Sequence, residues 1–313
     1  TVIMSKVCDN ESAYEEVAHI GTGAFGTVYK ARDRHNDGRF VALKKVRIPL
    51  NEEGIPMGTL REISLLKQLD SANHPNVVRL LDICHGCRMA GELVLFLVFE
   101  HVDQDLATFL DRCPEPGLDP ALIARLFKQL ITGVEFLHSN RIVHRDLKPQ
   151  NVLVTSRRQL KLADFGLARL YEYEMSLTPV VVTLWYRPPE VLMQTSYGLP
   201  VDLWSCGCIF AEMYRRKPLF SGQSEGDQLT KIFEVIGVPR KEDWPDIPLS
   251  WSTFQRCGEG KKLEDLVPEM EVAATDLLRE MLVFVPSKRI TASAALKHEY
   301  LRDVEVCVDS GER

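Results

Sequence analysis

The length and composition describe a folded protein of about two domains. The chain has 313 residues, and a typical domain uses about 150. Apolar residues make up 45% and charged residues 26%, while 19 glycines and 17 prolines are too few for a fibrous or low-complexity protein. Because 44 acidic residues outnumber 38 basic ones, the net charge is −6, which argues against general affinity for nucleic acid or an anionic membrane surface.

The cysteines and the apolar runs favour the cytoplasm and the nucleus. The longest apolar run, Leu93–Phe99, is far shorter than the roughly 20 residues of a membrane-spanning helix, and Thr1–Asn10 does not resemble a secretory signal. Eight cysteines lack the regular spacing of a disulfide framework. Cys84 and Cys87 form a C-x-x-C without a second ligand pair or a βαβ setting, so we expect buried or loop cysteines rather than a metal or redox site.

The first hundred residues carry mainly strand patterns. β-Branched and aromatic residues predict strands at Val28–Arg32, Phe40–Val46 and Leu93–Phe99, with a hairpin turn at Asn36-Asp37-Gly38. One helix is expected from about Pro56 to Leu69, where apolar residues recur at helical spacing.

Helical periodicity dominates after residue 105. It is clearest in Ala121–Ser139, and further helices are expected at Val201–Tyr214, Gly226–Ile236 and Ala273–Phe284. The predicted organisation is an N-terminal extension at 1–13, a small β-rich lobe at 14–100, a hinge at 101–105, a larger α-rich lobe at 106–304 and a polar tail at 305–313.

A glycine-rich segment is the first candidate for phosphate binding. The run Ile20-Gly21-Thr22-Gly23-Ala24-Phe25-Gly26-Thr27-Val28 contains G-x-G-x-x-G. A dinucleotide-binding fingerprint needs a helix directly after the glycines, whereas this chain continues as a strand. We therefore predict a lid between two strands whose backbone N–H groups approach a triphosphate. Taken alone, the segment also fits an ordinary glycine-rich hairpin.

A lysine in a predicted strand is the second candidate. Lys44 ends the run Val41-Ala42-Leu43-Lys44, and a cation in a strand suited to burial needs a compensating anion. Glu62 on the following helix is the candidate partner. The pattern Thr59-x-x-Glu62 also fits a capping box, and both roles are open if the helix rotates.

Two further motifs are more specific. His144-Arg145-Asp146-Leu147-Lys148-Pro149-Gln150-Asn151 is followed by Asp164-Phe165-Gly166. With the glycine loop, Lys44, Glu62, Pro188-Pro189-Glu190 and Asp202-Leu203-Trp204-Ser205-x-Gly207, these motifs resemble the eukaryotic protein kinases over about residues 14–300. The resemblance implies an α+β, bilobal protein kinase fold, with one regulatory helix in the small N-lobe.

The resemblance also assigns roles that suit phosphoryl transfer. Asp164 and Asn151 would hold Mg²⁺, and Lys44 would grip the α and β phosphates of ATP. Asp146 would orient the substrate hydroxyl and accept its proton. Lys148 resembles the lysine of serine/threonine kinases. A catalytically inactive kinase fold that serves as a binding module is the alternative.

The adenine site follows from the same resemblance. The base would lie against apolar side chains and bond to the hinge backbone at two residues. The lining residues are Ile20, Val28, Ala42, Phe99 and Leu153, and the hinge residues are Glu100 and Val102.

The regulatory segments resemble one group of kinases. Pro56–Glu62 resembles the cyclin-contacting helix of the cyclin-dependent kinases. With Phe99–Leu106, Asp164–Arg169 and Val180–Arg187, the chain is most similar to the G1 branch that D-type cyclins activate. A mitogen-activated kinase would carry Thr-x-Tyr where this chain has Leu177-Thr178-Pro179. Another proline-directed kinase of the same group is the alternative.

This resemblance implies regulation and partners. An activating kinase would phosphorylate Thr178, which adds about −1.5 to −2 charges, and Arg61, Arg145 and Arg169 would converge on the phosphate. Protein substrates would carry Ser/Thr-Pro sites, as in retinoblastoma-type substrates, read near Val181, Val182 and Arg187. Ankyrin-repeat inhibitors are further candidate partners.

Several residues depart from the family pattern. Ala24-Phe25 lacks the hydroxyls that inhibitory kinases modify in many relatives, so we expect no such inhibition here. Gly58 would weaken the cyclin-contacting helix by about 0.5 to 1 kcal/mol relative to alanine, which predicts strong dependence on the cyclin. Pro179, Pro188 and Val285 are further departures without an assigned effect.

Overall fold

The computed structural model describes residues 13–23, 26–49, 57–85, 92–165, 169–170 and 183–305. The chain divides into two compact units. The first combines Thr1–Asp103 with Lys161–Gly166, and the second combines Gln104–Leu160 with Leu167–Arg313. The first unit thus includes a short segment that lies within the predicted large lobe in the sequence and carries Asp164.

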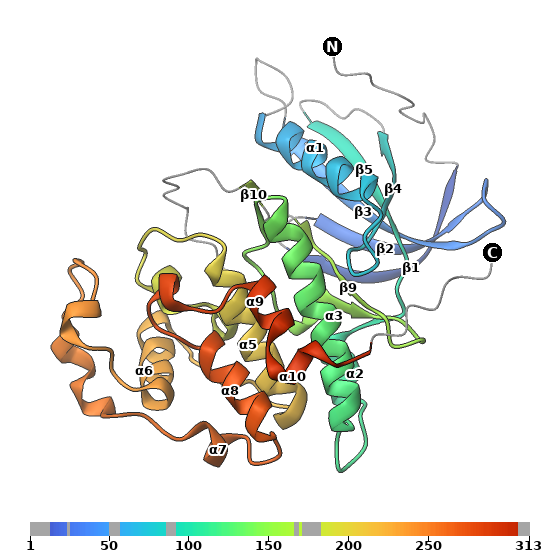
Figure 1. Ribbon diagram of the computed structural model, residues 1–313. Coiled ribbons are helices and arrows are strands. Elements are labelled where there is room, and N and C mark those ends of the chain that lie inside the picture. Colours follow the sequence, from blue (N-terminus) through green and yellow to red (C-terminus); the bar gives the residue numbers. More distant parts are fainter. Residues whose placement is uncertain are drawn as a thin grey trace. The chain divides into compact units, whose positions relative to one another are not determined.

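The first unit is built on a five-stranded antiparallel sheet (Figure 1). Its strand order is β1-β2-β3-β5-β4. The strands are β1 Tyr14–Gly23, β2 Gly26–Asp33, β3 Phe40–Pro49, β4 Leu80–His85 and β5 Glu92–Glu100. The three strands expected from the sequence lie within β2, β3 and β5, whereas β1 and β4 were not singled out.

The turn between β2 and β3 is organised by one buried aspartate. Asp33 is 1% exposed, and its carboxylate accepts hydrogen bonds from the backbone N–H of His35 and Asn36 and from the Asn36 amide. Asp37 and Gly38 have φ values of 54° and 67°, as the Asn-Asp-Gly signal requires. Burial alone would raise the pKa of Asp33, but the hydrogen bonds from Asn36 and His35 hold it below its usual range.

A compact apolar cluster stabilises this sheet. It consists of Ala31, Val41, Leu43, Cys84, Val94, Phe96 and Val98. Alternate residues of β3 enter the cluster, as the two-residue period of a strand requires. Cys84 is buried, and its thiol donates to Oδ2 of Asp82 at 3.6 Å, while Cys87 lies outside the described residues.

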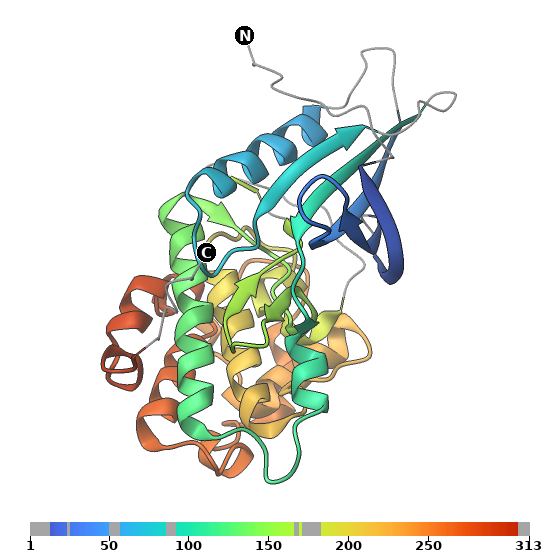
Figure 2. The same cartoon turned by 90° about the vertical axis from the view of Figure 1, so that its right-hand side faces the viewer.

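The helix of the first unit is α1, Met57–Ser71. It runs beside β4 and β5 (Figures 1 and 2) and contacts β4. Among its described side chains, the buried apolar ones are Leu65, Leu66 and Leu69. The side chains of the first six residues of α1, which include Gly58, lie outside the described residues.

The second unit consists mainly of helices. They are α2 Leu106–Asp111, α3 Pro120–Ser139, α4 Pro189–Leu192, α5 Pro200–Arg215, α6 Glu225–Ile236, α7 Leu263–Leu266, α8 Val272–Met281, α9 Ala292–Lys297 and α10 Glu299–Arg302. Short strands accompany them: β6 Gln104–Asp105, β7 Ile142–Val143, β8 Val152–Val154 and β10 Arg169–Leu170. A further strand, β9 Leu160–Leu162, begins here at Leu160 and continues into the first unit. The order β6-β8-β9 forms one small sheet, and β10 pairs with β7.

The core of the second unit lies between α3 and α5. Phe127 of α3 stacks on Phe210 of α5 with ring centroids 3.9 Å apart, and both side chains are fully buried. Gly207 lets α8 approach closely, because a Cβ at this position would lie 3.0 Å from Cβ of Met281. α9 and α10 pack on α3 (Figure 1). Among the described helices, none has the length and apolar character needed to cross a membrane.

Candidate active site

The cation predicted in β3 is paired with a carboxylate. Nζ of Lys44 donates to Oδ1 of Asp164 at 2.7 Å, and the lysine side chain is only 11% exposed. Asp164 has a φ of 60°, in the left-handed region. The structure therefore supplies an anion for Lys44 within the first unit. The side chain of Glu62 lies outside the described residues, so its pairing with Lys44 stays a prediction.

The glycine segment forms the hairpin between β1 and β2, and no helix follows it. Gly21 pairs with Val28 and Gly23 pairs with Gly26. Gly26 has a φ of 134°, and a Cβ there would lie 2.2 Å from the carbonyl oxygen of Lys45. Only glycine fits this position. Ala24, Phe25 and the side chain of Thr22 lie outside the described residues.

The residues expected to line the adenine fall in both units. Ile20, Val28, Ala42 and Phe99 lie on β1, β2, β3 and β5 of the first unit, and Leu153 lies on β8 of the second. Ala42 pairs directly with Phe99 across β3 and β5. The predicted hinge residues, Glu100 and Val102, follow at the end of β5.

Three predicted catalytic residues converge in the second unit. Nζ of Lys148 donates to Oδ2 of Asp146 at 2.8 Å. The side-chain amide nitrogen of Asn151 donates to the same carboxylate oxygen at 2.9 Å and to the backbone oxygen of Asp146 at 2.8 Å. These bonds fix the amide group of Asn151, so its oxygen is the atom that the side chain offers to a cation.

A buried aspartate at the start of α5 supports this loop. Asp202 is fully buried, and it accepts hydrogen bonds from the backbone N–H groups of His144 and Arg145 and from Nε2 of His138, each at 2.9 Å. Burial would raise the pKa of Asp202, but the hydrogen bond and charge of His138 and the loop N–H groups hold it below its usual range. The sequence placed Asp202 only within a motif and did not predict this role.

The segment before the Pro-Pro-Glu motif is anchored from α5. The Tyr186 hydroxyl donates to Oε2 of Glu212 at 2.7 Å, and the Ser205 hydroxyl donates to the backbone oxygen of Tyr186 at 2.8 Å. Burial raises the pKa of Glu212 to about 7, although the hydrogen bond from Tyr186 lowers it in part. Arg187 follows directly; burial lowers its pKa, and the carboxylates of Glu225 and Asp146 oppose that effect.

A buried ion pair fixes Glu190 of the Pro-Pro-Glu motif in place. Both guanidinium NH₂ groups of Arg289 bond to the carboxylate of Glu190, at 2.8 and 3.1 Å. Arg289 also donates to the backbone oxygens of Pro200 and Val283 and lies over the ring of Trp204. This bidentate geometry is the strong form of an arginine–carboxylate pair.

Known proteins are similar to this chain over most of its length. The family described as "Protein kinase domain" matches residues 14–301. Cyclin-dependent kinase 4 of Sus scrofa is 58% identical over 298 residues, which cover 94% of this chain and 98% of that protein. The chain belongs to the cyclin-dependent kinase family. The protein of the same name is 57% identical in Mus musculus, over 93% of this chain and 97% of the relative, and 56% identical in Xenopus laevis, over 96% and 93%.

These relatives confirm the main sequence-based conclusions. The protein is a cyclin-dependent serine/threonine kinase of G1 control, with the α+β kinase fold that the motifs implied. ATP as the phosphoryl donor and use of Mg²⁺ follow for the family in general.

The predicted phosphate-binding cluster of this kinase is described only in part. Thr178 and the side chains of Arg61 and Arg169 lie outside the described residues. Arg145 is described: its φ is 70° and its N–H is bonded to Asp202. Convergence of the three arginines on phosphorylated Thr178 stays a prediction.

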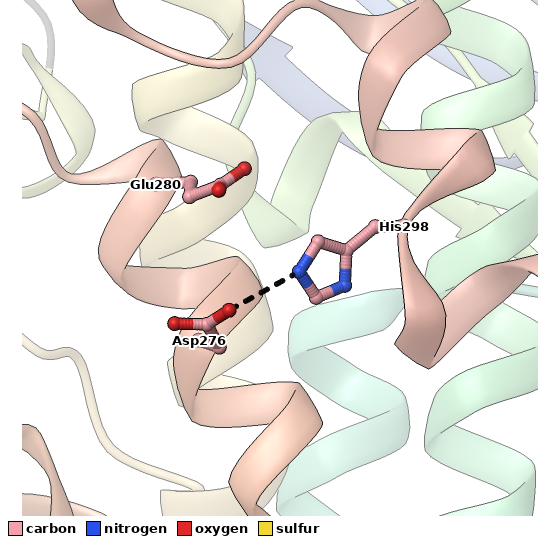
Figure 3. A group of neighbouring side chains, drawn as sticks. All are labelled: Asp276, Glu280 and His298. Carbon is pink, nitrogen blue, oxygen red and sulfur yellow. Dashed lines mark ion pairs between the residues drawn. The ribbon is translucent and has the colours of Figure 1, made fainter.

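A group of metal-ligand residue types that the sequence analysis missed lies elsewhere in the kinase. Asp276, Glu280 and His298 bring their ligand atoms within 4.8 Å of one another (Figure 3). Nδ1 of His298 accepts the N–H of Tyr300 at the start of α10. A neutral ring then carries its proton on Nε2, which faces Asp276. That nitrogen has no lone pair for a cation, so His298 serves as the cap of α10, with its Nε2 3.6 Å from a carboxylate oxygen of Asp276.

Proposed function

We propose that this kinase transfers the γ-phosphoryl group of ATP to serine or threonine followed by proline, as a complex with a D-type cyclin. Its substrates would be retinoblastoma-type proteins that act in G1. The observation that carries the proposal is the convergence of Lys148 and Asn151 on one carboxylate oxygen of Asp146.

Asp146 would act on the substrate hydroxyl. A general base must lie within hydrogen-bond reach of the proton that it accepts, in a fixed orientation. Lys148, Asn151 and the loop anchored by Asp202 hold the Asp146 carboxylate in place. Lys148 is a cation beside the same carboxylate, where it would attract the transferring phosphoryl group.

The residues that would hold Mg²⁺ suit this ion. Mg²⁺ prefers oxygen ligands, and Asp164 offers a carboxylate while Asn151 offers the amide oxygen left by its two N–H bonds. When bound, the ion would neutralise negative charge on the phosphate oxygens. Lys44, already paired with Asp164, would then turn to the α and β phosphates.

Regulation would act through the two segments that resemble those of the relatives. A D-type cyclin would contact the region 56–62, where α1 begins at Met57. An activating kinase would phosphorylate Thr178, and Arg61, Arg145 and Arg169 would bind the phosphate. We also propose that ankyrin-repeat proteins inhibit the complex and that the protein acts in the cytoplasm and the nucleus.

A transfer assay with matched peptides tests the proposal. The chain is purified with a D-type cyclin and phosphorylated at Thr178, and radiolabelled ATP is supplied with a retinoblastoma-type Ser-Pro peptide or its Ser-Ala counterpart. We expect label on the Ser-Pro peptide and loss of that label in Asp146→Asn. Equal labelling of both peptides would refute proline direction, and absence of transfer in every state would indicate an inactive binding module.

A further inference from the structure

A buried lysine of the first unit lies outside every motif used above. Lys161 is in β9, three residues before Asp164, and is 8% exposed. Its Nζ donates to Oε1 of Glu100 at 2.7 Å. Glu100 ends β5 and is one of the two residues whose backbone is expected to bind adenine. The ion pair therefore joins the strand that leads to Asp164 to the backbone expected to bind adenine.

Glu100 also forms two hydrogen bonds with the backbone of Arg79. Its Oε1 accepts the N–H of Arg79 at 2.9 Å, and its own N–H donates to the backbone oxygen of Arg79 at 3.1 Å. The main chain and the side chain of Glu100 are thus bonded to the same residue. A rotation of the Glu100 peptide would have to break this pair of bonds together with the bond to Lys161.

The segment that includes Arg79 is also bonded to β9. The N–H of Leu162 donates to the backbone oxygen of Asn76 at 2.8 Å, and the N–H of Val78 donates to the backbone oxygen of Leu162 at 2.9 Å. Residues 76–79 therefore connect β9 to the end of β5, and Lys161 bonds directly between the two. The result is a closed ring of hydrogen bonds around Glu100.

We propose that Lys161 is a positioning residue for adenine recognition, acting through the carboxylate of Glu100. The inference rests on the proposed ATP site and adds a determinant of nucleotide choice. Adenine presents an amino donor where guanine presents a carbonyl acceptor. Backbone groups that are held in position bind guanine more weakly than adenine, because the donor and acceptor pattern of guanine leaves them without hydrogen-bond partners. This discrimination weakens when the backbone is free to move.

The test compares ATP and GTP in the cyclin complex of Lys161→Met. Loss of the ion pair between Lys161 and Glu100 weakens binding of the base equally in the ground state and in the transition state. KM for ATP should therefore rise about tenfold, while kcat stays within about twofold of the wild-type value. The ratio of kcat/KM for ATP to that for GTP should fall at least about fivefold. Lys161→Arg keeps a cation and should retain most of the ratio.

Lys128→Met is the matched control. Nζ of Lys128 donates to the backbone oxygens of Leu301, Arg302 and Val304 in the second unit. The substitution removes a lysine that makes several hydrogen bonds but lies outside the hinge and outside the residues expected to bind ATP. This variant should lose thermal stability and keep the wild-type ATP to GTP ratio.

Two further measurements make the outcome decisive. The double variant Lys161→Met with Glu100→Leu removes both charges of the pair, so it avoids an unpaired carboxylate if the single variant fails to fold. It should show the same lowered ratio. Displacement of a fluorescent nucleotide by ATP or GTP gives the ratio without phosphoryl transfer, so a failure of the proposed kinase activity does not mask the result. An unchanged ratio in the folded variants would overturn the proposal and leave Lys161 a purely structural residue.

Discussion

The buried carboxylate of Glu212 gives a prediction with a definite sign. Burial raises its pKa from 4.5 to about 7, so the folded state holds a proton that the unfolded state releases. Stability from this group is complete below pH 4.5 and is lost as the pH rises through 7. At about 1.4 kcal/mol per tenfold change, the loss amounts to about 3 kcal/mol.

The substitution Glu212→Gln removes the titration and keeps an oxygen acceptor for the Tyr186 hydroxyl. Below about pH 4.5 the variant should match the wild type, and at pH 8 it should be more stable by about 3 kcal/mol. For a chain of this length that difference corresponds to about 6 °C in Tm.

Thermal unfolding of both proteins at half-unit steps from pH 5 to pH 8 checks this expectation. Glu259→Gln makes the same substitution at an exposed position and is the control for the loss of one carboxylate at the surface. If the Tm difference between Glu212→Gln and the wild type stays constant across this range, the assignment of a raised pKa is wrong.

Three other predictions concern the catalytic loop, the buried ion pair and activation. Asp146→Asn should lower kcat by about 10²- to 10⁴-fold with little change in KM for ATP. Steady-state kinetics of the cyclin complex measure both constants, and an effect mainly on KM would contradict this prediction. Arg289→Met leaves Glu190 buried without its partner and should destabilise the fold by about 3 to 5 kcal/mol; a Tm within 2 °C of the wild type would argue against it. Thr178→Ala should remove most activity of the cyclin-bound protein, and full activity in the transfer assay would refute the role of this phosphosite.

The sequence predicted elements well where a pattern is local. The helical period of Ala121–Ser139 and the hairpin signal at Asn36-Asp37-Gly38 depend on neighbouring residues, and both match the structure closely. The contacts around Asp146 are likewise local, because Lys148 and Asn151 bond to it from two and five residues further along the chain.

Contacts between distant segments were not predictable in the same way. Glu190 and Arg289 are 99 residues apart, and Lys161 and Glu100 are 61 apart, so no periodicity connects them. One signal was available for Asp202, because an acidic residue in an otherwise apolar helix must find hydrogen-bond donors when it is buried. The donors themselves, the N–H groups of His144 and Arg145, become evident only when the fold brings the loop to α5.

The most direct test of the account is the rate at which the Thr178-phosphorylated cyclin complex labels a Ser-Pro peptide from MgATP, measured beside the same complex carrying Asp146→Asn. We predict transfer by the first complex, with a strong preference over the Ser-Ala peptide, and loss of at least 99% of that rate in the second. Equal rates in the two complexes, or no transfer by either, would contradict the assignment of Asp146 as the catalytic base of this kinase.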